Sequence, residues 1–269
     1  MVVDLMTITD NKIYFNGSFS LVRPEWLKNE FGSLTGEKIK IAVIDSGCDE
    51  FITNDSRIIK GISFICHKEG FTFEKNDNYI DKLGHGTACI DIILQIAPAV
   101  EILPVKVFAS RLETSIEILV EAINFAIDEE VDIINLSLGT KLSEALYPLY
   151  YVCEKAKEKG ITIISANANM DINSYPAIFE NVISVSSDET NNKFDYKFND
   201  DELCECIANG FPDDALTISG MRLKMGGNSF AAPVITGIIA LFIQKYDIRC
   251  LEELRKLLKK FSVNNRIIN

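Results

Sequence analysis

The chain has 269 residues, of which 47% are hydrophobic and 25% charged, so its composition excludes wholesale disorder and low complexity. A chain of this length can bury a large core without metals or disulfides. Its 27 basic and 39 acidic residues give a net charge of −12, which argues against a protein that binds the phosphate backbone of nucleic acids.

The sequence also bears on where the protein works. No apolar run approaches the roughly 18 residues needed to cross a bilayer, so we expect no membrane span. Asp4 and Asp10 stand where a secretory signal would have a basic start and an apolar middle. The seven cysteines are odd in number and scattered, which favours reduced thiols over a disulfide framework. We therefore expect a cytoplasmic protein.

Strand-like and helix-like segments alternate along the chain. The segment Lys38–Asp45 is a short apolar run that ends in Ser46-Gly47, typical of a buried strand followed by a turn. Further on, the pattern predicts a helix over His85–Ala97, a strand over Glu101–Phe108, a helix over Ser115–Glu129, a strand over Val131–Leu138, a helix over Leu142–Lys159, strands over Ile161–Ala166 and Val182–Ser186, and helices over Ser229–Lys245 and Leu251–Phe261.

This alternation predicts an α/β fold of three layers, with a mainly parallel twisted sheet and helices on both faces. Between Asp188 and Gly227 the chain is polar and turn-rich, so hairpins and loops are expected there. No stretch resembles a linker, and we expect one domain over residues 23–269 after an N-terminal extension of residues 1–22. In such sheets the chemistry sits outside the carboxyl ends of the strands.

Three short segments carry reactive side chains at the ends of these elements. Asp45-Ser46-Gly47 ends the first strand, Gly84-His85-Gly86-Thr87 opens a helix, and Gly227-Asn228-Ser229-Phe230-Ala231-Ala232-Pro233 opens another. A serine hydroxyl is a weak nucleophile until a base such as histidine takes its proton. A buried carboxylate then orients the imidazole, and N–H groups at a helix N-terminus favour a developing oxyanion.

Asp45, His85 and Ser229 follow one another in the chain order of the subtilisin-like serine proteases, and the chain resembles that family from about residue 23 to about residue 246. The three segments are similar to the family's signatures D-[ST]-G, H-G-T and G-T-S-x-A-x-P. The resemblance implies a subtilisin-like fold and a serine endopeptidase that cuts peptide or protein substrates through an Asp-His-Ser triad and an acyl-enzyme, with no cofactor.

The resemblance also implies an oxyanion-hole asparagine after a buried strand. Counting from Gly160 without gaps places Asn169 at the family's asparagine, and Asn167 is the competing choice. The side-chain amide would donate to the oxygen of the tetrahedral intermediate, beside the main-chain N–H of Ser229.

Substrate-binding segments follow from the same resemblance. Ser137-Leu138-Gly139 is similar to the family's S-L-G segment beside the substrate, and Thr114-Ser115-Ile116 falls where the opposite flank should lie. An extended peptide would add between them as a strand. Met170 is expected to line the pocket for the residue before the cut and to favour an apolar residue, although Asp171 beside it could pair with a basic one.

Several features depart from the family's pattern. The segment after His85 continues as an unbroken helix where many members carry an insertion around calcium, and the Cys204–Cys206 pair lacks zinc spacing, so we expect no metal. Only 44 residues precede Asp45, which predicts an enzyme without the usual pro-domain. Asn228 replaces the threonine usual before the nucleophile. Cys89 is expected beneath the imidazole, four residues further along the same helix face.

Two functions of different classes remain open at this point. The first is an intracellular protease, either one that matures a leader or precursor peptide or one that degrades proteins generally. The second is a catalytically silent subtilisin-like scaffold that binds a peptide or partner. The intact Asp45, His85 and Ser229 set favours the enzyme, and a monomer is expected.

Overall fold

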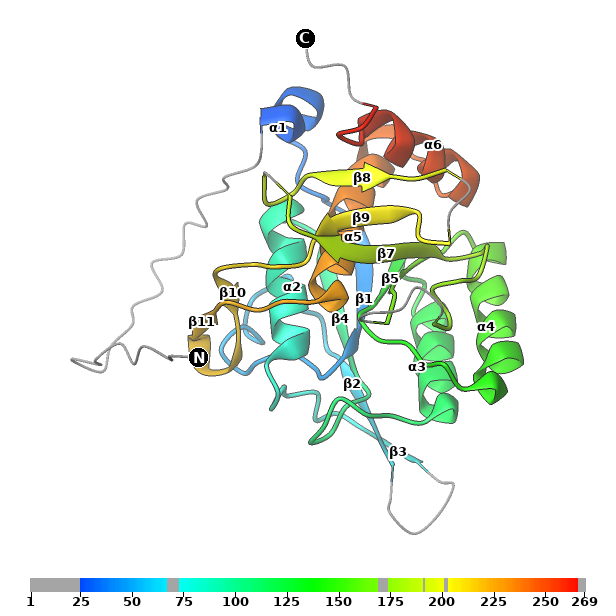
Figure 1. The fold of residues 1–269 in the computed structure, drawn as a ribbon. Coiled ribbons are helices and arrows are strands. Elements are labelled where there is room, and N and C mark those ends of the chain that lie inside the picture. Colours follow the sequence, from blue (N-terminus) through cyan, green and yellow to red (C-terminus); the bar gives the residue numbers. More distant parts are fainter. Residues whose placement is uncertain (1–24, 67–72, 169–173, 191, 201–202, 266–269) are drawn as a thin grey trace, which may run out of the picture.

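The centre of the molecule is a nine-stranded twisted sheet (Figure 1). The computed structural model describes residues 25–66, 73–168, 174–190, 192–200 and 203–265. The strand order is β3-β2-β4-β1-β5-β6-β7-β9-β8, and the two outermost pairs, β2–β3 and β8–β9, are antiparallel while the inner pairs are parallel. The predicted mainly parallel α/β sheet is confirmed.

The strands of this sheet are β1 (Lys40–Asp45), β2 (Ile62–Cys66), β3 (Phe73–Asn76), β4 (Glu101–Lys106), β5 (Ile133–Leu136), β6 (Thr162–Ala166), β7 (Ile183–Asp188), β8 (Tyr196–Phe198) and β9 (Cys206–Asn209). A separate hairpin pairs β10 (Ala215–Leu216) with β11 (Arg222–Leu223). The helices are α1 (Glu25–Phe31), α2 (His85–Ile96), α3 (Ile116–Asp128), α4 (Leu146–Glu158), α5 (Asn228–Tyr246) and α6 (Leu251–Phe261).

Side chains of the central strands alternate between two apolar cores. On β1, Ile41 and Val43 face the core shared with α1, α2, α5 and α6, whereas Ala42 and Ile44 face the core shared with α3 and α4. Because successive side chains of a strand point to opposite faces, a strand buried on both faces must be apolar throughout. This explains the unbroken apolar run of β1, and Figure 1 shows the two helix layers on either side of the sheet.

Helix α5 is the buried core helix of the fold. By length and composition α5 could cross a membrane. The expectation that no apolar run is long enough for this is therefore wrong for α5. However, 78% of that stretch is buried inside the molecule, where it packs on α2 and the sheet. Gly237 permits this packing, since a Cβ at that position would press against the Ile96 side chain of α2. Burial on all sides accounts for the apolar composition of α5.

The predicted elements are present with altered ends. Helix α6 has the predicted bounds, α2 ends one residue earlier than predicted, and α3 is one residue shorter than predicted at each end. The predicted helix over Leu142–Lys159 begins instead with the 3₁₀ turn η1 (Ser143–Ala145) before α4. The predicted strand over Val131–Leu138 is only four residues long, because Ser137 and Leu138 leave the sheet. Sequence patterns missed α1, β2 and β3.

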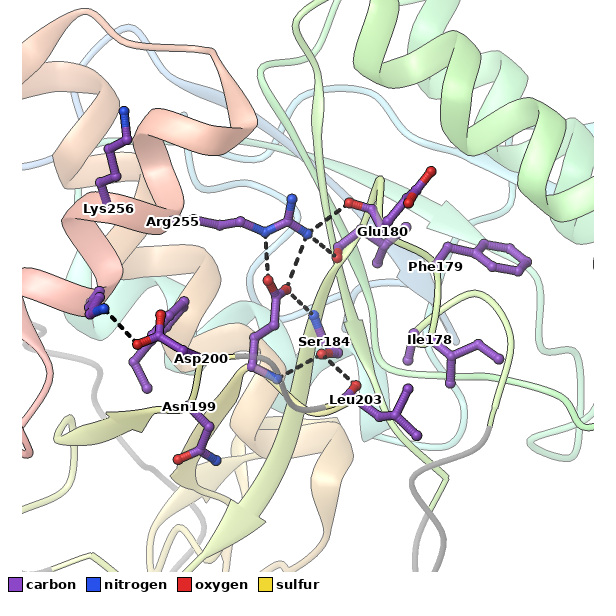
Figure 2. Close-up of a pocket in the computed structure, with 14 residues that line it drawn as sticks. Ile178, Phe179, Glu180, Ser184, Asn199, Asp200, Leu203, Arg255 and Lys256 are labelled. Carbon is purple, nitrogen blue, oxygen red and sulfur yellow. Dashed lines mark hydrogen bonds and ion pairs between the residues drawn. The ribbon is translucent and has the colours of Figure 1, made fainter.

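An arginine on α6 fastens this helix to the sheet. The Arg255 guanidinium donates to both carboxylate oxygens of Glu205 and to the main-chain carbonyls of Glu180 and Val182. Glu205 also accepts from the main-chain N–H of Ser184. All five residues line one surface depression, and Figure 2 shows Arg255 there with its guanidinium directed toward Glu180. Since its charged side chains are paired within the protein, we assign this depression a structural role.

We predict that Arg255→Ala lowers thermal stability. The substitution leaves Glu205 and two carbonyl oxygens without the donor that they share. The Arg255 side chain is only 22% exposed, so water replaces these bonds incompletely. A cost of about 2 kcal/mol corresponds to a decrease in Tm of about 4–8 °C for a chain of this size. Differential scanning calorimetry measures this change. The control is Lys256→Ala, whose exposed side chain pairs with Glu253 on the same helix. An equal decrease in both variants would contradict the assignment.

Candidate active site

The carboxylate of Asp45 lies fully buried at the carboxyl end of β1. Its Oδ1 accepts a hydrogen bond from the main-chain N–H of Ser46 at 2.7 Å. The Ser46 hydroxyl in turn accepts from the main-chain N–H of Gly86, which ties the end of β1 to the start of α2. This approach requires glycine, because a Cβ on Gly86 would collide with the main chain of Gly47. The D-S-G and H-G-T segments are thus in direct contact.

His85 is the first residue of α2, and Asp81 holds that helix end in place. Asp81 Oδ1 accepts from the N–H groups of Leu83 and Gly84, and its Oδ2 accepts from the N–H and hydroxyl of Thr87. Burial by itself would raise the pKa of Asp81, but these hydrogen bonds outweigh it and lower that pKa. Sequence reasoning missed Asp81, although an acid just before a helix is a recognisable capping signal.

The imidazole of His85 is hydrogen-bonded to Asp45. Its Nδ1 lies 2.8 Å from Asp45 Oδ1 and 2.9 Å from Oδ2, and because a carboxylate only accepts, Nδ1–H is the donor. Burial by itself would lower the pKa of His85, but the charge of Asp45 and this hydrogen bond, with Asp81 assisting, outweigh it and raise the pKa. The Phe230 ring packs on the imidazole, with ring centroids 5.1 Å apart. Nδ1 is thereby committed, which leaves Nε2 as the nitrogen available for proton transfer.

Ser229 is the second residue of α5 and is partly exposed. Its carbonyl oxygen accepts from the Ser137 hydroxyl at 2.7 Å, and its own hydroxyl donates to the Ser137 carbonyl at 3.1 Å. These reciprocal bonds join the start of α5 to the residue that follows β5. Within the described residues, no hydrogen bond joins Ser229 Oγ to His85, so this contact forms only after the hydroxyl turns away from Ser137.

The thiol of Cys89 lies beneath these groups, as predicted. Its Sγ is 3.3 Å from Ser137 Oγ and 3.9 Å from Asp45 Oδ2. Asp45, His85 and Cys89 place three possible metal ligands within 4.8 Å of one another. Burial, assisted by the charge of Asp45, raises the pKa of Cys89 well above its usual range. The contacts of these three side chains form a hydrogen-bond network around the imidazole.

A pocket of about 570 Å³ opens beside Ser229 and His85. Every described residue of the two predicted substrate segments lines it, from Thr114-Ser115-Ile116 on one side to Ser137-Leu138-Gly139 on another. The roles of these residues in substrate binding stay predictions. Sequence reasoning missed the apolar side chains that complete the lining, which are Phe108, Leu112, Leu119 and Leu142. They come from separate loops and helices, and no local motif marks them.

The predicted oxyanion donor and pocket residue, Asn169 and Met170, lie outside the described residues, as does Asp171. The competing choice, Asn167, is buried after β6, and its Nδ2 donates to Ser186 Oγ at 3.1 Å. This donor is therefore engaged with β7. Residues 1–22 also fall outside the described part, so the proposed N-terminal extension stays a prediction.

Comparison with known proteins agrees with this fold. Residues 36–266 match the Subtilase family. The minor extracellular protease Epr of Bacillus subtilis is 31% identical over 83% of this chain but only 35% of that protein. Subtilisin DY of Bacillus licheniformis is 28% identical over 85% of each chain. The major intracellular serine protease of Bacillus subtilis is 29% identical over 79% of this chain and 70% of its own length.

Two solved structures share the fold at low identity. A cold adapted subtilisin-like serine proteinase superposes with a TM-score of 0.68, at 20% identity over 87% of each chain. The nisin leader peptidase NisP from Lactococcus lactis superposes with a TM-score of 0.69, at 22% identity over 84% of this chain and 83% of that one. The chain thus belongs to the subtilase family. It is a subtilisin-type serine endopeptidase, and its substrates are peptides or proteins.

We predict that kcat/KM rises with pH as His85 loses its proton, because only the neutral imidazole accepts a proton from serine. The midpoint lies above the usual histidine value of about 6.5, since the pKa of His85 is raised. Asp45→Asn removes the main raising contributions, so the midpoint moves to lower pH and kcat falls by about 10⁴-fold. Steady-state hydrolysis of a peptide ester across the pH range measures both.

The matched control for this experiment is Asp49→Asn, which alters a buried carboxylate that bonds the N–H groups of Phe51 and Ser219 rather than His85. This variant should keep the wild-type midpoint. An Asp45→Asn midpoint equal to that of the wild type would show that Asp45 does not set the pKa of His85.

Proposed function

We propose that this protein hydrolyses peptide bonds by the serine protease route. Ser229 attacks the scissile carbonyl, His85 takes the serine proton through Nε2 and then passes it to the leaving amine, and Asp45 holds the imidazole. Water next hydrolyses the acyl-enzyme by the same proton transfers. The observation that carries this proposal is the buried Asp45–His85 hydrogen bond beside a partly exposed serine at a helix start.

We assign the oxyanion site to the side-chain amide of Asn169 together with the Ser229 N–H. Two observations support this assignment. Counting from Gly160 without gaps places Asn169 at the family's asparagine, and the amide of the competing Asn167 already donates to Ser186. Donors fixed in advance around the developing negative charge are usually the largest single contribution to such catalysis. Ser229 is the second residue of α5, and the N-terminal dipole of this helix favours the same charge.

The bound substrate is an extended peptide with an apolar side chain upstream of the cut. Main-chain groups of residues 114–116 and 137–139 flank the pocket and can pair with the peptide as an added strand. Ile116, Leu119, Leu138 and Leu142 give the pocket an apolar lining. Burial of an apolar side chain there contributes binding free energy, whereas a charged side chain would lose hydration.

In the cell, we propose that the enzyme matures a leader or precursor peptide in the cytoplasm. One of the similar structures is described as a nisin leader peptidase, which supports a restricted substrate. Six cysteines are free thiols, of which Cys48, Cys89, Cys153, Cys204 and Cys206 are buried and Cys250 is exposed. Burial raises the pKa of Cys48 and Cys153, so these thiols stay protonated, as suits a reducing compartment.

A fluorophosphonate tests the nucleophile directly. We expect intact-mass spectrometry to show one adduct on the wild type and none on Ser229→Ala, because only an activated serine reacts. Ser219→Ala, which alters a serine outside the pocket, serves as the control and should label like the wild type. A folded wild type that takes up no adduct would favour the silent binding scaffold over the enzyme.

Substrate range tests the maturation role. We expect cuts in a mixed pool of extended peptides to concentrate at few sites that share an apolar residue at one upstream position. Ile116→Glu should lower cleavage of these peptides by about 10-fold or more, because it places a charge in the apolar lining. Leu203→Glu, on an exposed leucine outside this pocket, is the control. Cleavage of unfolded casein at many unrelated sites, as fast as defined precursors, would indicate general turnover.

A further inference from the structure

Asn228, the residue before the proposed nucleophile, stands at the junction of three elements. It begins α5, its side chain is buried, and it occupies the position where the family's signature has threonine. The side chain of Asn228 is longer than that of threonine and ends in an amide, so it can reach groups that a threonine hydroxyl could not.

The two ends of the Asn228 amide bind two different strand ends. Its Oδ1 accepts from the main-chain N–H of Ser187 at 2.8 Å and from the Ser187 hydroxyl at 2.7 Å, near the end of β7. Its Nδ2 donates to the carbonyl oxygens of Asn167 at 3.1 Å and Ala168 at 3.2 Å, just after β6. These four bonds connect the start of α5 to both neighbouring strands.

Only an amide side chain can make this set of bonds. An aspartate of the same shape has no donor for the two carbonyls, and a threonine hydroxyl has a single proton on a shorter stem. Asn167 and Ala168 line the pocket beside Ser229, so the Nδ2 bonds act on the pocket wall itself. The chain continues from Ala168 directly into Asn169.

We propose that Asn228 is a positioning residue, which sets the spacing between Ser229 and the main chain of Asn167 and Ala168. This inference rests on the proposed function, because that main chain leads into the proposed oxyanion donor. A donor that is fixed in advance lowers the barrier only if its distance from the nucleophile is held within about 0.5 Å. Asn228 fixes this distance at both ends, because it is bonded covalently to Ser229 and its side chain donates to the carbonyls of Asn167 and Ala168.

The test compares Asn228→Asp and Asn228→Thr with the wild type. Asn228→Asp keeps the shape but turns an acceptor toward two carbonyls, and Asn228→Thr restores the family's usual residue if the aspartate variant fails to fold. We expect kcat on a peptide amide to fall by about 10-fold or more in each, while KM changes by less than about threefold. Affinity for a peptide boronate, which forms a tetrahedral adduct with serine, should fall in parallel with kcat.

A matched control separates positioning from stability. Asn181→Asp makes the same chemical change at a buried asparagine outside the pocket, whose Nδ2 bonds Glu154. This variant should lower Tm without lowering kcat or boronate affinity. Asn228 variants that fold and keep kcat and boronate affinity within about twofold of the wild type would overturn the inference. A wild type that does not react with a fluorophosphonate would instead overturn the proposed function, and the inference with it.

Discussion

The buried hydrogen bond between Asp45 and His85 is the interaction on which the site depends. A carboxylate without solvent contact is costly unless donors surround it, and here the donors come from the Ser46 main chain and from the first residue of α2. Because the Asp45 carboxylate needs these hydrogen-bond donors, the start of α2 lies against the end of β1. Gly86 permits this approach, because a Cβ there would collide with the main chain of Gly47.

The same principle extends along the carboxyl edge of the sheet. Ser137, just after β5, exchanges two hydrogen bonds with Ser229 at the start of α5, and Asn228 bonds the ends of β6 and β7. The start of α5 is thus bonded to the ends of three neighbouring strands, β5, β6 and β7. Ser229 is thereby attached to a sheet that is buried on both faces.

Catalytic positioning and helix attachment use separate parts of the molecule. Arg255 and Glu205 fasten α6 at a depression that shares no described lining residue with the pocket beside Ser229. Nε and Nη2 of Arg255 already bind groups of the protein, whereas the pocket beside Ser229 presents apolar side chains and a partly exposed hydroxyl.

Sequence alone determined the α/β alternation and pointed to Asp45, His85 and Ser229 and to the two segments that line the pocket, because apolar periodicity and short signatures are local properties. It misjudged α5, whose apolar length reflects burial on all sides, and it missed Asp81. Only the tertiary structure decided that Asn228 spans two strands, that Ser137 bonds Ser229, and that Phe108 and Leu142 share one lining. These contacts join residues far apart in the chain, and their partners are set by strand order, which no local pattern encodes.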